Sequence, residues 1–329
     1  MLRRIGIFIL SLVFVALSSR VLAQTITSSV NGTVTDPGGA VVAGATITVT
    51  NVDTNVSTSA QTNSDGVYNI RFLQVGRYTL AVDAPGFARQ ISKPFTLEAG
   101  QNAKLDSQLS IQGNLSSVNV NSELLPLINT ENAQLATTLD KTAIDAVPMI
   151  GRNFVQLTLF TPGSVSTTPA GFAGNAAIGV GSQQVSVNGN REQSNNYLLD
   201  GIEINETLNN GVGYNPSPDS LDQVQVVSAN AQAEYGNVNG GAVIALTRSG
   251  TNRWHGSAFY FLSDGVLDAN TWANKNNPTI TPRQPYTQPI FGGTLGGPIL
   301  KDKLFFFIDY EGGRYHQGGV ATATVAPPR

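Results

Sequence analysis

Residues 291–312 read FGGTLGGPILKDKLFFFIDYEG, two apolar segments around a short polar one. The first apolar segment, Ile290 to Leu295, predicts a strand, and the second, Leu304 to Tyr310, predicts another. Between them, Gly296 to Lys303 holds two glycines and a proline, so a short turn is expected there. This part of the chain is therefore expected to fold as an antiparallel hairpin.

An aromatic strand and a long loop precede this hairpin. Residues 258–262 read AFYFL, and the following segment from Asp264 to Thr287 is polar and contains several Asn and Pro residues. A long loop followed by a short turn is the alternation of outer-membrane β-barrels, whose long loops face outward and whose short turns face the periplasm. The run Phe305-Phe306-Phe307 fits core packing in a soluble protein or alternate lipid-facing positions in a barrel, and the neighbouring loop pattern favours the barrel.

The N-terminal residues predict export. Arg3 and Arg4 precede an apolar run from Ile5 to Leu17, and small residues follow before an expected cleavage between Ala23 and Gln24. A membrane-spanning helix needs about 20 apolar residues, so this shorter run indicates a signal peptide over residues 1–23. The alternative is a buried N-terminal helix.

Composition narrows the function classes. Charged residues make up 12 % of the chain, and removing residues 1–23 takes away three arginines and no acid, which changes the net charge from −3 to −6. A negative chain argues against nucleic acid as a partner. The chain has no cysteine, so disulfides are excluded and no zinc site is expected.

Residues 24–112 predict a small β-sandwich. In the segment from Ala45 to Thr50 apolar and Thr residues alternate, and Tyr78, Leu80 and Val82 alternate again, as in half-buried strands. The segment Ser28 to Thr35 predicts a further strand, and Asp65-Gly66 predicts a tight turn. Short strands at this spacing are typical of a sandwich.

The same residues resemble a known family. The stretches GTVTDPGGAVVAGATITVTN (32–51), SDGVYNI (64–70), GRYTLAV (76–82) and APGF (84–87) resemble a carboxypeptidase-regulatory-like domain. The resemblance implies a prealbumin-like sandwich without peptidase activity, similar in fold to some starch-binding modules. Carbohydrate binding is therefore an alternative role, but the sandwich aromatics stand mostly at alternating core positions: Tyr68, Phe72, Tyr78, Phe87 and Phe95.

Residues 113–252 show a different pattern. A short helix is expected from Leu139 to Val147, and the rest is expected to form short strands with glycine-rich bends. Turn dipeptides stand at Asn188-Gly189 and Asp200-Gly201. Four stretches carry a second resemblance, in this order: GRNFVQLTLFTPG (151–163), VNGNREQSNNYLLDGIEIN (187–205), LDQVQVV (221–227) and AEYGNVNGGAVIALTRSGTN (233–252).

This ordered series resembles the plug domain of TonB-dependent receptors, in particular the Oar-like group. The stretches HGSAFYF (255–261) and 291–312 are likewise similar to the opening barrel strands of that group. The resemblance implies an α+β plug inside a barrel of about 22 strands. Residues 253–329 suffice for about three strands, so an incomplete barrel and a truncated chain are expected.

The resemblance also implies a partner and its contact segment. In the family an energised inner-membrane protein, TonB, pulls on an extended segment called the TonB box. By position and alternation, the best match is Ser117, Val118, Asn119, Val120, Asn121 and Ser122. A plain inter-domain strand fits these residues equally well.

Two sets of residues bear on a catalytic or metal-binding role, and two arginines on ion pairing. His255 and His316 stand far apart, and His255 is expected to be an interfacial residue in a strand. Asp200, Glu203 and Glu206 are spaced by three, which on a helix would suit Ca²⁺ ligation or a carboxylate pair, but Gly201 and the adjacent turn favour a loop with a solvated or packing role. Arg152 and Arg248 are expected to form structural ion pairs.

Together these features predict a mainly β protein with a prealbumin-like sandwich, an α+β plug domain and the first strands of an outer-membrane barrel. We expect a receptor and transporter in the outer-membrane lipid that binds an extracellular ligand and uses TonB, with the sandwich in the periplasm. No enzyme activity and no cofactor are expected. The alternative is a surface binding or adhesion protein whose sandwich binds carbohydrate.

Overall fold

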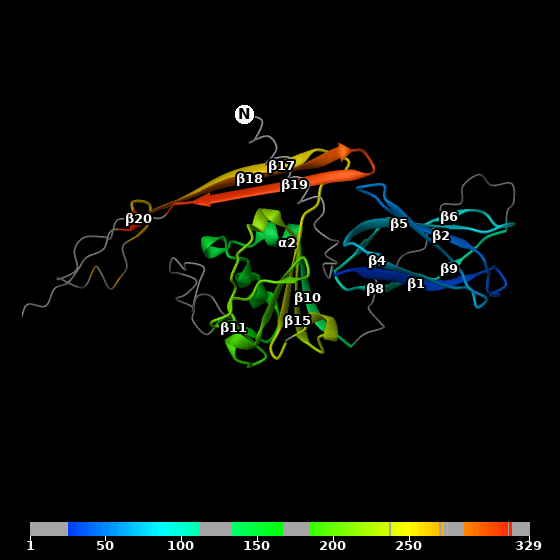
Figure 1. The fold of residues 1–329 in the computed structure, drawn as a ribbon, viewed down its shortest axis with the longest axis horizontal. Helices are drawn as coiled ribbons and strands as arrows, with labels where there is room; N and C mark the ends of the chain where they lie inside the picture. Colours follow the sequence, from blue (N-terminus) through cyan, green and yellow to red (C-terminus); the bar gives the residue numbers. More distant parts are fainter. Residues whose placement is uncertain are drawn as a thin grey trace, which may run out of the picture.

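The computed structural model describes residues 26–111, 133–166, 185–236, 238–269 and 286–314, with residues 272, 275, 316 and 317. Figure 1 shows three parts in chain order: a sandwich (residues 26–111), a central domain (residues 133–252) and a sheet of long strands, called here the long-strand sheet. All three are built mainly from β-strands. Among the described residues, no helix is long and apolar enough to cross a bilayer.

The sandwich consists of two sheets with one apolar core. Its strands are β1 (Ser28–Thr35), β2 (Thr46–Asn51), β3 (Ser57–Gln61), β4 (Val67–Leu73), β5 (Gly76–Asp83), β6 (Gln90–Ile91), β7 (Phe95–Leu97), β8 (Asn102–Lys104) and β9 (Ser107–Gln108). One sheet has the order β4-β1-β8, with β9 also on β1, and the other has the order β3-β2-β5-β6, with β7 on β5. The predicted alternation is confirmed, since Tyr78, Leu80 and Val82 all point into the core.

Phe72 was expected in this core, and that expectation is wrong. Its side chain is 81 % exposed and its φ is +62°, a rare backbone conformation for an aromatic residue. The cause is a bulge: Ser28 pairs with Leu73 and Val30 pairs with Ile70, so two residues of β4 face one of β1. The bulge turns Leu73 inward in place of Phe72.

The central domain is a five-stranded sheet with order β10-β15-β16-β13-β14. Its elements are β10 (Leu135–Asp140), α2 (Lys141–Ala146), the 3₁₀ helices η1 (Ile150–Arg152) and η2 (Phe154–Phe160), β11 (Ser164–Ser166), β12 (Val185–Val187), η3 (Glu192–Ser194), β13 (Asn196–Leu199), β14 (Ile202–Glu203), η4 (Pro218–Ser220), β15 (Leu221–Ala229), η5 (Ala233–Tyr235) and β16 (Ala242–Thr247). Strands β15 and β16 are buried on both faces, and β16 is accordingly apolar except for Thr247.

Several local predictions for this domain hold. Asn188-Gly189 and Asp200-Gly201 adopt positive φ at both residues, as two-residue hairpin turns require. The predicted helix is present as α2, and it starts at Lys141 because the Asp140 carboxylate accepts a hydrogen bond from the Ala143 N–H.

The prediction of short strands across residues 151–163 is wrong for most of that stretch. Residues 154–160 form the 3₁₀ helix η2, which buries Phe154, Val155 and Leu157 against the sheet. Asn153 starts this helix, because its side chain accepts a hydrogen bond from the Val155 N–H. The spacing of the buried residues is helical, and this outweighed the β preference of Phe and Val.

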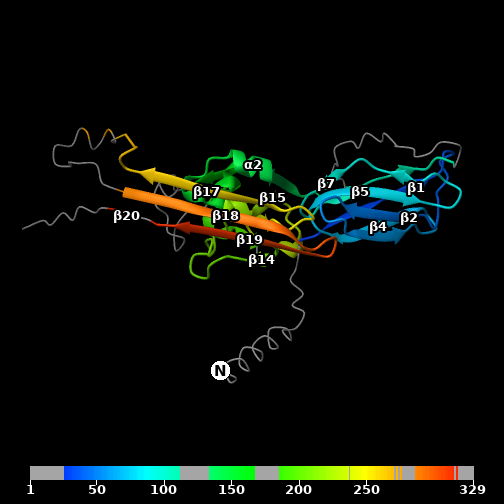
Figure 2. The same cartoon turned by 90° about the horizontal axis from the view of Figure 1, so that it is seen from above.

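The long-strand sheet contains β17 (His255–Asp264), β18 (Tyr286–Leu300) and β19 (Leu304–Gly313), with β20 (His316–Gln317) paired to β18. Its strands are antiparallel in sequence order. Figures 1 and 2 show this sheet lying across the central domain, with the β18–β19 turn directed toward the sandwich.

The expected turn from Gly296 to Lys303 is wrong in length. Strand β18 continues through Gly296, Gly297 and Pro298 to Leu300, and only residues 301–303 form the turn. The glycines belong in the strand because neighbouring rings lie over them: a Cβ at Gly297 would approach Trp254 to 2.9 Å, and one at Gly296 would approach His255 to 2.6 Å. They therefore make room for aromatic packing.

Candidate functional site

Arg152 lies where the central domain meets the long-strand sheet. Gly151 and Arg152 both adopt positive φ (+63° and +54°), and this kink between η1 and η2 aims the guanidinium out of the central domain. The Arg152 side chain is only 14 % exposed. The local backbone therefore holds a cation at the boundary between the two parts.

Four side chains from distant segments surround this guanidinium. Arg152 Nε donates to Glu311 Oε2 of β19 at 2.8 Å, and an Arg152 terminal nitrogen pairs with Asp219 of η4. The guanidinium carbon also lies 4.2 Å from the ring centroid of Phe259 and 5.0 Å from that of Phe261. Ion pairing and cation–π attraction thus fasten the central domain to β17 and β19. The ion-pair prediction for Arg152 is confirmed.

Arg248 behaves differently from the prediction. Its guanidinium carbon lies 5.4 Å from the ring centroid of Phe307, and among the described residues it has no carboxylate within ion-pair distance. It does influence Asp222 at longer range: burial raises the pKa of the Asp222 carboxyl, and the charges of Arg248 and Lys141 oppose that rise. Arg248 therefore makes a cation–π contact with Phe307, and its positive charge favours the ionised form of the Asp222 carboxyl.

The acidic residues at 200, 203 and 206 do not converge. Asp200 accepts hydrogen bonds from the Thr247 N–H (2.8 Å) and hydroxyl (2.7 Å), and so joins β13 to β16. Glu206 accepts from the Leu208 N–H (2.7 Å) and other loop N–H groups, and these bonds lower the pKa of its carboxyl. Glu203 lies in the short strand β14. Among the described residues no group of three His, Asp or Glu is placed to hold a metal ion.

The two histidines occupy the strands of the long-strand sheet. His255 begins β17, and its ring stacks on Phe307 with centroids 6.2 Å apart. His316 lies in β20, where it pairs with Thr287. The expectation that His255 sits in a strand is confirmed. The expected cleavage site at Ala23 and Gln24 and the candidate TonB box from Ser117 to Ser122 lie outside the described residues.

A joint between the sandwich and the central domain was not predicted. Gln223 and Gln225 project from the same face of β15, and both contact the backbone of Ala99. The Ala99 N–H donates to Gln223 Oε1 (3.0 Å), and Gln225 Nε2 donates to the Ala99 carbonyl (3.1 Å). All three residues are buried. The two amides thus satisfy both backbone groups of one sandwich residue.

Apolar packing accompanies these hydrogen bonds. The residues that share this cluster are, from the sandwich, Ile26, Val75 and Ala99 and, from the central domain, Leu198, Val227, Ala231, Tyr235, Val238, Ala242, Ile244 and Leu246. They cover the face of the central sheet opposite to α2 and η2, whose residues pack into a separate cluster. The sandwich therefore closes the second face of the central sheet.

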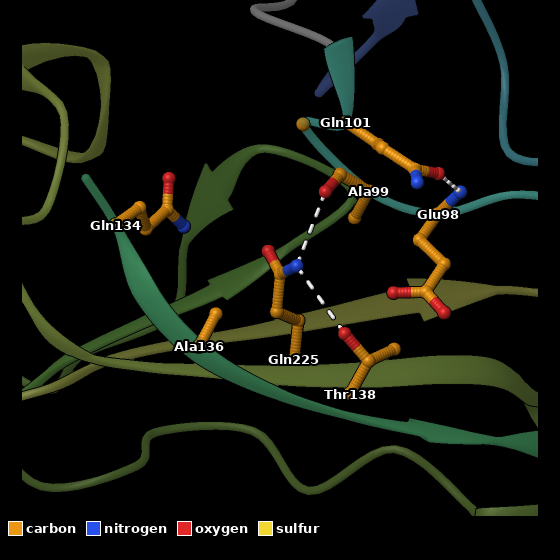
Figure 3. A pocket seen from close by; sticks show the side chains of 8 residues that line it. Glu98, Ala99, Gln101, Gln134, Ala136, Thr138 and Gln225 are labelled. Atoms are coloured by element: carbon orange, nitrogen blue, oxygen red, sulfur yellow. Dashed lines mark hydrogen bonds between the residues drawn. The ribbon is translucent and has the colours of Figure 1, made fainter. Parts of the chain in front are cut away.

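A polar pocket borders this joint (Figure 3). It has a volume of about 160 Å³, and its lining residues are Glu98, Ala99, Gly100, Gln101, Gln134, Ala136, Thr138 and Gln225. Gln225 stands between Ala99 and Thr138, with its amide nitrogen directed toward both. A space of this size lined by polar groups accommodates several water molecules.

A second joint links the sandwich to the β18–β19 turn. Asn55 Nδ2 donates to Asp302 Oδ1 at 3.0 Å, and the Asn252 N–H donates to the Asp53 carbonyl at 3.0 Å. Asn252 and Asp302 also exchange two hydrogen bonds of 2.8 and 2.9 Å with each other. The side-chain bonds of this joint are exposed, unlike those at Ala99.

Three family models match the chain in order. A carboxypeptidase regulatory-like domain matches residues 29–110, a TonB-dependent receptor plug domain matches residues 132–243, and an outer membrane beta barrel domain matches residues 246–329. The matches fall on the sandwich, the central domain and the long-strand sheet respectively. The expected domain types are therefore confirmed.

One curated relative and two solved structures place these matches in context. The chain is 30 % identical over 277 residues to the TonB-dependent transporter Oar of Myxococcus xanthus. The aligned region covers 80 % of this chain and 24 % of that protein. The siderophore receptor PirA from Acinetobacter baumannii is similar with a TM-score of 0.39 and 20 % identity, over 55 % of this chain and 24 % of that one. The Bacillus anthracis TIE protein matches with a TM-score of 0.23 and 20 % identity, over 26 % of this chain and 16 % of that one. The chain spans about a quarter of the length of the curated relative.

Proposed function

Because the chain carries the domains of a TonB-dependent receptor of the Oar-like group, we propose that it acts in the outer membrane as a receptor and transporter. In this proposal an extracellular ligand binds, and TonB supplies the energy that moves the central domain as a plug. The proposed divisions are a signal peptide at 1–23, the sandwich at 24–112 in the periplasm, the plug at 113–252 and barrel strands at 253–329. No enzyme activity is proposed.

The observation that carries this proposal is the way Arg152 holds the central domain. A plug has to stay in place at rest and yet shift under force. The Arg152 contact suits both requirements, because it joins Asp219 of the central domain to Glu311 of β19 through one cation. A polar contact of this kind is broken and re-formed more readily than a continuous apolar core.

The segment from Ser117 to Ser122 is proposed as the TonB box. It precedes β10, which lies at the edge of the central sheet and, among the described strands, pairs with β15. Leu135, the first residue of β10, pairs with Ala229 at the end of β15. A pull from the N-terminal side of β10 therefore reaches this antiparallel ladder first at the Leu135–Ala229 pair.

Cellular fractionation and uptake test the proposed function. The gene product that contains this sequence is followed to the outer-membrane fraction, and uptake of labelled ferric siderophores, oligosaccharides, peptides and cobalamin is compared in cells with and without TonB. We expect outer-membrane location and loss of uptake of one of these ligands without TonB. A protein recovered as a soluble periplasmic species would refute the proposal.

Cysteine cross-linking tests the proposed box. Residues 1–329 contain no cysteine, so single substitutions at residues 117–122 report without background from this part of the protein. We expect cysteines in this segment to form disulfides with a cysteine in the receptor-binding region of TonB, whereas Ser110→Cys, at the exposed end of the sandwich, should not. Equal cross-linking at both places would remove the assignment.

A further inference from the structure

The sandwich touches both parts that have to separate if the central domain moves. It contacts the central domain through Ala99 and the β18–β19 turn through Asn55. One rigid body cannot keep both contacts while the central domain shifts against the barrel strands. This question arises only under the proposed function, on which the inference rests.

The contact with the central domain is the stronger one. Gln223 and Gln225 bind both backbone groups of Ala99, and all three residues are buried. Separation would break both hydrogen bonds together and would require water to enter a closely packed surface.

Close packing strengthens this contact further. Gly100 has a φ of +62°, and its Cα faces the Tyr235 hydroxyl so closely that a Cβ there would come within 2.7 Å of the oxygen. Ile26 and Val75 pack against the same cluster as Ile244. Separation would expose this apolar surface to water.

The contact with the β18–β19 turn is weaker. To the turn itself the sandwich contributes the Asn55 amide, whose hydrogen bond with Asp302 is exposed, while the Asp53 carbonyl accepts from Asn252 at the end of the central domain. Water replaces such a bond at little cost. Asp302 also exchanges two hydrogen bonds with Asn252, so the turn has side-chain bonds that do not involve the sandwich.

We propose that the sandwich travels with the central domain, and that its contact with the β18–β19 turn opens when the central domain moves. The sandwich is then a moving part of the plug and a brace that ties the resting plug to the barrel. On the sandwich, this brace is Asn55, in the turn between β2 and β3.

Three pairs of introduced cysteines test this movement in cells. The sandwich–barrel pair is Asn55→Cys with Asp302→Cys, and the sandwich–plug pair is Glu98→Cys with Thr138→Cys, which lie across the same pocket (Figure 3). Asp219→Cys with Glu311→Cys reports plug–barrel separation, since both carboxylates contact Arg152. The probe is a short bismaleimide, and its cross-linking rate is compared in cells with and without TonB.

We expect all three pairs to cross-link in cells without TonB, which also shows that each variant has folded. With TonB, the rates of the sandwich–barrel and plug–barrel pairs should fall severalfold, and the rate of the sandwich–plug pair should stay the same. A fall in the sandwich–plug rate with a constant sandwich–barrel rate would overturn the inference. An unchanged plug–barrel rate would instead refute the proposed plug movement itself.

Discussion

Arg152 and Glu311 are 159 residues apart in the chain, and their side chains form a hydrogen bond of 2.8 Å. Arg152 belongs to the kink before η2, and Glu311 to the far end of β19. Asp219 and two aromatic rings complete the surroundings of the guanidinium. This hydrogen bond can form only while the central domain is in contact with the long-strand sheet.

Replacement of Arg152 by Ala should loosen this seating. The change leaves Asp219 and Glu311 without their cation, and both carboxylates are partly buried. Loss of one partner of a fully buried pair costs about 3–5 kcal/mol, and the partial exposure here reduces the expected cost to about 2 kcal/mol. Urea titration of the purified protein, followed by hydrogen exchange of residues 154–160, measures the loss. Arg253→Ala, at an exposed position, is the matched control, and equal effects of the two changes would contradict the prediction.

Asp222 should make the central domain less stable as the pH rises. Burial raises the pKa of its carboxyl above the ordinary 3.8, so the folded state binds the proton more tightly than the unfolded chain. Its contribution to stability is therefore most favourable below pH about 3.8 and decreases as the pH rises through the folded-state pKa. Asp222→Asn should raise the urea midpoint at pH 7 and lose this advantage at acidic pH. A lower midpoint for the variant at pH 7 would show that the attraction to Arg248 outweighs burial.

Gly292 should tolerate no side chain. A Cβ there would approach the Tyr310 carbonyl oxygen to 2.2 Å and the Phe259 ring to 2.6 Å. Gly292→Ala is expected to cost about 1–3 kcal/mol through overpacking and to lower the yield of assembled barrel. Heat-modifiable migration in gels measures that yield. In the same sheet, a Cβ at Gly313 would find its nearest atoms at 3.9 Å, so Gly313→Ala should assemble like the unmodified protein.

Gln225→Ala should weaken the sandwich and the central domain together. The change removes the donor to the Ala99 carbonyl, and a buried group left without its partner costs about 1–3 kcal/mol. Hydrogen exchange should become faster both in residues 95–99 of the sandwich and in β15. Gln74→Ala, at an exposed position of the sandwich, serves as control. Faster exchange in β15 alone would indicate that the two parts do not stabilise each other.

Local sequence signals predicted strands and turns correctly where hydrophobic alternation or turn geometry alone determines the backbone. Val82 and its alternating neighbours face one core, and Asp200-Gly201 leaves the backbone few alternatives to a tight turn. Predictions were wrong where tertiary contacts decide. Residues 154–160 pack as a helix on the sheet, Phe72 is turned outward by a bulge, and the glycines at 296 and 297 lie under aromatic rings.

The site was harder to predict than the fold. The sequence indicated that Arg152 forms ion pairs, but its partners are 67 and 159 residues away, and local patterns carry no information at such separations. The Gln223 and Gln225 pair did leave a signal. Two amides that alternate with valines along a buried strand cannot both be buried without partners, so they indicate a docking surface.

The burial of the central sheet on both faces has a practical consequence for the choice of fragments. Its second face is completed by Ile26, Val75 and Ala99, which a division at residue 113 would remove. A recombinant fragment that starts after the sandwich would expose an apolar surface around Tyr235 and Ile244 to water. Such a fragment would aggregate or bind detergent. Ligand screening with a soluble piece of this protein should therefore use one that begins before Ile26, so that both folding units are produced as a single polypeptide.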